Sequence, residues 1–323
     1  MTYRARHVWA VLLGFLVLVP ASPAQARAQD VAGVVTELKR GHGVVEVKPA
    51  GTSEWRSVGP LLALRAGDAL QATADAIVVV LLGGGRGSVR IDAASSPFSV
   101  PELPAEDGLA RKGATLLQRS LGALSTTRSD PTYVKLGTRA ARRPPVVLSP
   151  RNGLILPGEI RIEWSGIPER RYAVTVLDAG GDRVEQVSVQ GPALTLSTVA
   201  PVLSPGIRYR VQVATGNLRP EEAWFEILDA TRSMAVRQDL AEVEQTAGPD
   251  VSMSTLAALK AVVLADQDLL SDARQVVLSA LKSDPDEASL HLLLGNLYRR
   301  MGLAEQAAES FEEAALLSTG KRR

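Results

Sequence analysis

Few side chains in this 323-residue sequence could act as a catalytic base or a metal ligand. The chain has no cysteine, so thiolate nucleophiles, cysteine-bound metals and disulfides are excluded. Once a leader at the start of the chain is set aside, the remaining histidines are His42 and His291. They fall in different predicted elements and form no His-x-x-x-His pair, so neither a Ser-His-Asp triad nor a metal site is expected.

Two acidic pairs, Asp266 with Asp268 and Glu312 with Glu313, could in principle exchange protons or bind a hard cation. On exposed helix ends and faces such carboxylates more commonly serve solvation. We therefore expect no catalytic residue, no cofactor and no bound metal. The chain is predicted not to be an enzyme.

A glycine-rich stretch, residues 83–88, invites comparison with loops that cradle phosphate groups. Such a loop must lead into a helix whose N-terminus faces the anion, and a Walker motif carries a lysine at its end. Here that lysine is missing, and residues 89–91 have the pattern of a strand. The stretch is predicted to be a hairpin turn.

The first 26 residues have the order of a secretory signal peptide: Arg4 and Arg6, an apolar run over 8–19, and small residues ending at Ala26. About 20 apolar residues are needed to span a bilayer, and this run has only about a dozen. We therefore expect cleavage after Ala26 or Ala28 rather than a retained anchor. The mature protein would then lie in the periplasm, on the cell surface or outside the cell. The net charge of +1 indicates neither nucleic acid nor an anionic membrane as partner.

Residues 30–105 are predicted to form a β domain, because short β-branched runs alternate with glycines. A Gly67-Asp68 turn, a short strand ending in Thr73, an apolar strand, a glycine hairpin and a further strand follow one another. This order resembles the FecR-type periplasmic domain. The β-branched runs cover residues 31–38, 44–47, 76–82 and 89–91.

The resemblance implies the periplasmic fold alone. The name-giving FecR proteins relay an outer-membrane signal to a cytoplasmic sigma factor through a membrane helix and a cytoplasmic tail. Here the apolar run begins at Val8, which leaves too few residues before it for a cytoplasmic module. Signal relay is therefore kept as a second alternative.

Residues 106–145 are predicted to be a linker. A short helix fits residues 114–121, and an arginine cluster over 139–143 precedes two prolines. The arginines could bind a polyanion, although a solvated interdomain linker is the commoner explanation.

Residues 146–228 are predicted to form an immunoglobulin-like β-sandwich, because seven alternating strands fit into this length. Trp164 ends an early strand, where a large aromatic side chain can fill the centre of a sandwich. The string L-x-P-G-x-x-Y over 203–209 resembles the turn and tyrosine corner of fibronectin type III domains. The seven runs are 146–148, 160–164, 172–177, 184–189, 194–196, 209–215 and 223–228.

Residues 230–318 have a helical period, and an offset of 34 residues aligns this segment with itself. Small residues recur where paired helices must approach, and large ones recur where the space between helices must be filled. The second unit resembles the tetratricopeptide repeat (TPR). The aligned pairs are Ala261 with Gly295, Leu264 with Tyr298, Ala273 with Ala307, Val277 with Phe311 and Ala280 with Ala314.

Two repeats are fewer than the about three that usually bury a solenoid core, so an open face is expected. An extra helix over residues 234–246, a partner or a second copy could cover it. The first unit departs from the family pattern at Lys260 and Asp268, and Thr319 stands where a proline usually closes the unit. A purely structural helical cap is the alternative to a binding surface.

The predicted protein-binding residues are Lys260, Asn296 and Arg299, at non-packing positions of the first helix of each pair. Repeat arrays typically bind peptides or proteins on the concave face that these helices line. Asn296 and Arg299 are three residues apart and share a helix face. An amide beside a guanidinium could hold a peptide backbone or a carboxylate there.

These patterns predict a multidomain fold: an all-β N-terminal domain, a β-sandwich middle domain and an all-α helical-repeat C-terminal domain. The expected function is that of an exported, non-enzymatic scaffold of the bacterial cell envelope, which binds envelope proteins through its helices and could form homo-oligomers. One alternative is a glycan- or peptidoglycan-binding module that uses the β domains, with Trp55 among few aromatic residues. The FecR-like relay is the other.

Overall fold

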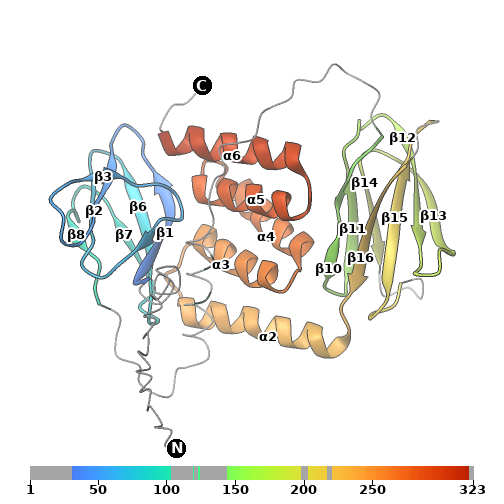
Figure 1. Ribbon diagram of the computed structural model, residues 1–323, viewed down its shortest axis with the longest axis horizontal. Helices are drawn as coiled ribbons and strands as arrows, with labels where there is room; N and C mark the ends of the chain where they lie inside the picture. The colour runs from blue at the N-terminus through green and yellow to red at the C-terminus, as the bar shows by residue number, and fades with distance from the viewer. Residues whose placement is uncertain are drawn as a thin grey trace, which may run out of the picture. The chain divides into compact units, whose positions relative to one another are not determined.

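The computed structural model describes residues 31–102, 119, 123, 144–197, 203–216 and 220–319. Within this part of the chain a β region over residues 33–227 precedes five helices over residues 230–319 (Figure 1). The predicted signal peptide and most of the predicted linker lie outside the described residues. No helix among the described residues combines the length and apolar character that crossing a membrane requires.

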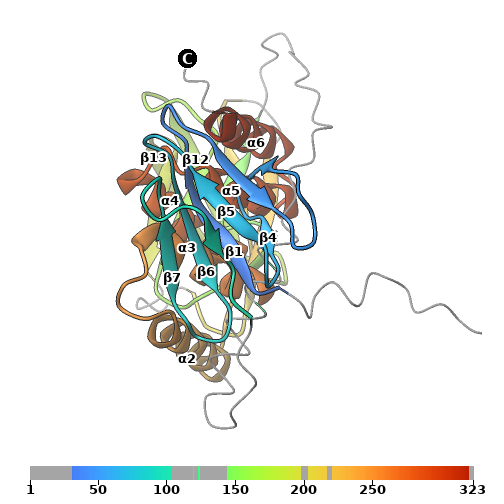
Figure 2. The ribbon, with the colours of Figure 1, turned by 90° about the vertical axis from the view of Figure 1, so that its left-hand side faces the viewer.

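The first β region forms two antiparallel sheets with strand orders β4-β1-β6-β7 and β3-β2-β5-β8. Strands β1 and β6 pair side by side (Figure 2). Both strands are buried on their two faces over most of their length, which is the pattern of strands covered from both sides. The strands are β1 Gly33–Lys39, β2 Val45–Lys48, β3 Arg56–Ser57, β4 Ala63–Leu64, β5 Ala69–Ala72, β6 Ile77–Leu82, β7 Ser88–Ile91 and β8 Phe98–Ser99.

The glycine-rich stretch is the hairpin between β6 and β7, as predicted. The backbone N–H of Leu82 donates to the carbonyl of Gly87 at 2.9 Å, and Gly84, Gly85 and Gly87 have positive φ angles. Because the stretch leads into a strand, it presents no helix N-terminus to a phosphate group.

The second β region also forms two sheets, with strand orders β10-β16-β15-β12-β13 and β14-β11-β9. All seven predicted strands are present, and the additional strand β10 pairs in parallel with β16. Strand β10 was not predicted. The strands are β9 Val147–Ser149, β10 Gly153–Ile155, β11 Glu159–Trp164, β12 Arg171–Leu177, β13 Arg183–Gln190, β14 Ala193–Ser197, β15 Arg208–Ala214 and β16 Glu221–Ile227.

Aromatic side chains fill the core of this second region. Trp164 is 2% exposed, and its ring meets that of Tyr172 edge-on at 5.4 Å between centroids. The hydroxyl of Tyr209 accepts a hydrogen bond at 2.8 Å from the backbone N–H of Ser204. The tyrosine thus ties the preceding turn to the start of β15, as the L-x-P-G-x-x-Y string predicted.

The five helices are α2 Ala230–Ala247, α3 Met253–Asp266, α4 Leu270–Ser283, α5 Ala288–Arg300 and α6 Ala304–Thr319. Helix α3 packs on α4, and α5 packs on α6. The turn inside each pair contains one residue of left-handed conformation, Asp268 with φ 59° and Gly302 with φ 75°, which are 34 residues apart. Aspartate is among the few residues other than glycine that tolerate this conformation. The departure from the family pattern at Asp268 therefore keeps the turn.

Gly295 sets the approach of α5 to α6. A Cβ atom at this position would lie 2.5 Å from the ring of Phe311. We expect Gly295→Ala to lower the free energy of unfolding by about 2 kcal/mol, because overpacking outweighs the better helix propensity of alanine. Urea unfolding of the same substitution beside Phe311→Leu provides the control. If Gly295→Ala lowers the free energy of unfolding as much beside leucine as beside phenylalanine, contact with the phenylalanine ring is not the cause of the destabilisation.

The helices also pack on both β regions. Helices α3, α5 and α6 contact β1, and α4 contacts β10. One apolar cluster joins Val34 and Leu81 of the first β region to the helices, and Leu148 and Leu154 of the second region pack against it. Helix α2 contacts α3 as the predicted extra helix. The open face expected of two repeats is therefore covered by other parts of the same chain.

Candidate functional site

The three predicted protein-binding residues do not form one exposed surface. Lys260 on α3 pairs with Glu244 of α2. Asn296 is only 8% exposed, and its amide nitrogen donates to the carbonyl of Leu292 at 2.9 Å. Arg299 is exposed and donates to Oδ1 of Asn296 at 2.6 Å, which confirms that these two share a helix face.

The expectation that Asn296 is exposed was wrong. Helix α5 contacts α3, α4, α6 and β1, so its side chains are buried from Ala288 to Tyr298 except that of His291, which is half-buried. Since β1 contacts both α3 and α5, the first helices of the two pairs are engaged within the chain. An alanine at position 296 would remove a buried hydrogen bond and is therefore a poor probe of partner binding.

A groove of about 430 Å³ lies between β11 and α4. Gln275 and Lys282 are exposed on its α4 side, and Leu278 and Leu281 are half-buried there. Arg161 of β11 is exposed on the other side. The groove therefore combines apolar side chains with two cationic groups.

A buried ion pair underlies this groove. Arg274 of α4 donates to Oε2 of Glu163 at 2.7 Å and to the hydroxyl of Tyr298 at 3.2 Å, and its side chain is 6% exposed. Its guanidinium also lies 5.5 Å from the centroid of the Tyr298 ring. Burial disfavours the charged form of Glu163, but hydrogen bonds from Arg161 and Arg274 outweigh this and lower its pKa. The pair therefore stays ionised.

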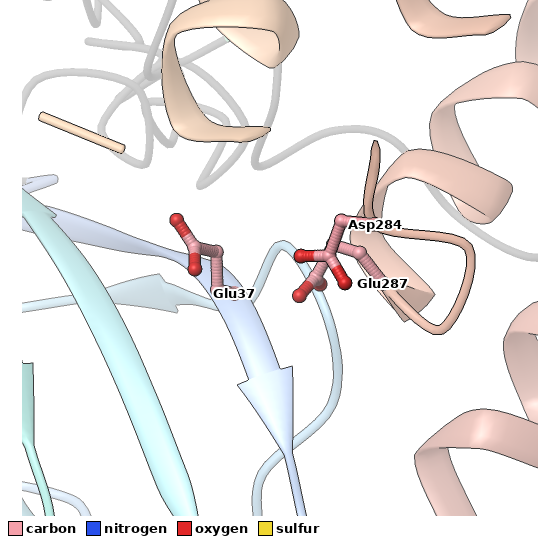
Figure 3. Close-up of side chains that lie close together, drawn as sticks. All are labelled: Glu37, Asp284 and Glu287. Atoms are coloured by element: carbon pink, nitrogen blue, oxygen red, sulfur yellow. The ribbon is translucent and has the colours of Figure 1, made fainter. Parts of the chain in front are cut away.

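A second cluster joins β1 to the turn between α4 and α5. It consists of three carboxylates, and one oxygen from each of Glu37, Asp284 and Glu287 lies within 4.8 Å of the others. Figure 3 shows the carboxylates of Asp284 and Glu287 side by side, directed toward the strand that carries Glu37. Glu287 is the N-cap of α5, where its Oε1 accepts from the backbone N–H of Ser289 at 3.0 Å and of Leu38 at 3.3 Å.

The groups of this carboxylate cluster differ in charge state. Burial, together with the charges of Glu37 and Asp284, outweighs the hydrogen bonds from Ser289 and raises the pKa of Glu287 to about 8. Lys39 donates to both oxygens of Asp284, at 3.0 and 2.8 Å. Burial lowers the pKa of Lys39, but the hydrogen bond and charge of Asp284 outweigh it, so the pKa is raised.

Hydroxyl groups of α3 and its N-cap surround the same carboxylates. Ser254 donates to Asp284 at 3.2 Å, Thr255 donates to Glu37 at 2.8 Å, and Ser252 also donates to Glu37. No local sequence pattern predicts this cluster, because 249 residues separate Leu38 of β1 from Glu287. The only local sign of the cluster is the acidic turn after α4, which carries Asp284 and Glu287.

Comparison with known proteins adds little. No protein-family model matches the chain, and no curated protein matches it. Among solved structures, the chain is similar to the fibronectin type III domain of the human collagen α1(XX) chain, with 19% sequence identity and a TM-score of 0.16. The match covers 28% of this chain and 80% of that domain. It is a weak neighbour and assigns no function.

Proposed function

We propose that this chain is an exported, non-enzymatic scaffold protein of the bacterial cell envelope. A FecR-like domain over residues 30–105 and a fibronectin type III-like domain over 146–228 would be held by a TPR-like domain over 230–318. The signal-like order of residues 1–26 supports export to the periplasm or cell surface. The observation that carries the proposal is the apolar cluster through which the helices pack on both β regions. Such packing suits a protein that holds binding surfaces in fixed positions.

In this proposal the partner binds through the helical segment, at the groove between β11 and α4. The contacts of β1 with α3 and α5 leave little of the expected concave face for a partner. Arg161, Arg274 and Lys282 bring three positive charges against the one negative charge of Glu163, so the groove has a positive balance. Half-buried Leu278 and Leu281 add apolar surface. An acidic peptide segment with an apolar anchor matches this chemistry.

The test is affinity capture of envelope proteins on the full mature chain. We expect Arg161→Ala with Lys282→Glu to reduce capture of the main partner by about tenfold, since each lost charge-assisted contact costs about 1 kcal/mol or more. The control is Arg183→Glu with Arg232→Glu, two exposed arginines outside the groove. A photo-crosslinking residue at Gln275 should label the same partner.

The glycan-binding alternative makes the opposite prediction. Trp55 in the first β region is half-buried, and the ammonium of Lys48 lies 5.3 Å from its ring centroid. If Trp55→Ala abolishes capture while the groove variant retains it, the β region is the binding module and the proposal fails. Deletion of the first β region would not discriminate, because its strand β1 packs on three helices.

A further inference from the structure

We propose that Glu37, Asp284 and Glu287 bind a divalent hard cation of the Ca²⁺ type, which clips strand β1 to the turn between α4 and α5. This inference goes beyond the scaffold function and does not depend on it. The donors come from two parts of the chain that meet only in the fold, since Glu37 lies on β1 and the other two flank the turn.

The spacing of the oxygens suits Ca²⁺. Oxygens bound to one Ca²⁺ lie about 2.4 Å from the ion, so two of them can be up to about 4.8 Å apart. One oxygen of each carboxylate lies within 4.8 Å of the others. Three carboxylates and the nearby hydroxyls of Ser254 and Thr255 form an all-oxygen donor set, which is the kind that Ca²⁺ prefers.

An independent observation is the second oxygen of Glu287. The residue is 0% exposed, and its Oε1 accepts two backbone hydrogen bonds. Its Oε2 is buried with no hydrogen-bond partner among the described residues. A buried polar atom without a partner is costly, and a cation beside the neighbouring carboxylates would satisfy it.

The charges of the cluster also favour a divalent ion. Once Glu287 has lost its proton, three ionised carboxylates face one ammonium, that of Lys39, and two negative charges remain for a cation to neutralise. Lys39 occupies both oxygens of Asp284, but its side chain is 45% exposed and can turn toward solvent. Lys39 therefore acts as a competitor of the cation.

The test is isothermal titration of the full chain, freed of metal with EDTA, with CaCl₂ and separately with MgCl₂ at pH 8. We expect one Ca²⁺ site with at least tenfold weaker binding of Mg²⁺. Glu287→Gln should weaken Ca²⁺ binding at least tenfold, whereas Glu309→Gln on an exposed face of α6 should leave it unchanged. Lys39→Met should strengthen binding severalfold, because the competing ammonium is gone.

Misfolding could explain weaker Ca²⁺ binding by Glu287→Gln, but it cannot explain stronger Ca²⁺ binding by Lys39→Met. The two variants together therefore test the site itself. The absence of Ca²⁺ binding to the unchanged chain would overturn the proposal. Binding that is insensitive to Glu287→Gln would also overturn it, because the ion would then lie elsewhere. Partner capture through the groove is a separate measurement, so its failure leaves this result intact.

Discussion

Replacing Arg274 with methionine is expected to lower the free energy of unfolding by about 3 kcal/mol, because it leaves the partly buried carboxylate of Glu163 with fewer donors. Arg274 is 5% exposed and spans three elements, since it extends from α4 to β11 and to Tyr298 of α5. Methionine keeps most of the side-chain volume, so a loss reports on the ion pair and hydrogen bonds rather than on a cavity. Urea unfolding at pH 7 measures it.

Arg208 provides the matched control. It also pairs with a glutamate, Glu226 at 3.2 Å, and its guanidinium lies 4.3 Å from the ring centroid of Trp224. Its side chain is 57% exposed, so Arg208→Met should cost less than about 1 kcal/mol. Arg274→Lys should be intermediate, because an ammonium cannot match the fork of a guanidinium. Equal losses of unfolding free energy for Arg274→Met and Arg208→Met would show that burial does not strengthen the Arg274–Glu163 pair.

Raising the pH from 5 to 9 in EDTA is expected to destabilise the protein through Glu287. Its pKa is about 8 in the folded chain and 4.5 as the ordinary value, so the folded state holds a proton that the unfolded state has lost. Stability contributed by the neutral carboxyl is therefore present below about pH 4.5 and is lost as the pH rises to 8. At about 1.4 kcal/mol per pKa unit, the loss is at most about 5 kcal/mol.

Two variants separate the contributions to this pH dependence. Glu287→Gln removes the ionisation and should flatten the profile above pH 5. Burial raises the pKa of Asp272 of α4 to about 7, although a 3.3 Å hydrogen bond from the backbone N–H of Leu156 opposes the rise. Its ionisation therefore also lowers stability as the pH rises. Asp272→Asn should remove that second part. A profile of Glu287→Gln that parallels the unchanged chain would contradict the assignment.

Local patterns in the sequence predicted the elements but not their contacts. The alternation in β11 and β15 follows from one buried and one exposed face, and both strands were predicted. The same offset of 34 residues separates Asp268 and Gly302, the left-handed residues of the two paired turns. These features depend on neighbours along the chain.

The candidate sites depend on which apolar faces pack together, and the periodicity of a single segment does not indicate this. Strand β1 was predicted as a strand, but no local pattern indicated that helices α3 and α5 would pack on it. The exposure predicted for Asn296 failed for this reason, since it assumed a free face on the first helix of the pair. The carboxylate cluster went unpredicted because Glu37 and Glu287 meet through the same packing.

The packing of β1 on the helices also bears on how the chain reaches its native state during synthesis. A ribosome makes β1 before any of the five helices, so Val31, Val34 and Leu81 are synthesised well before the helices that cover them. During that interval the first β region carries an uncovered apolar surface. Contacts of such long sequence separation form slowly and leave partly folded chains prone to association. We therefore expect a nascent chain to expose this apolar surface to chaperones until the helices have been made.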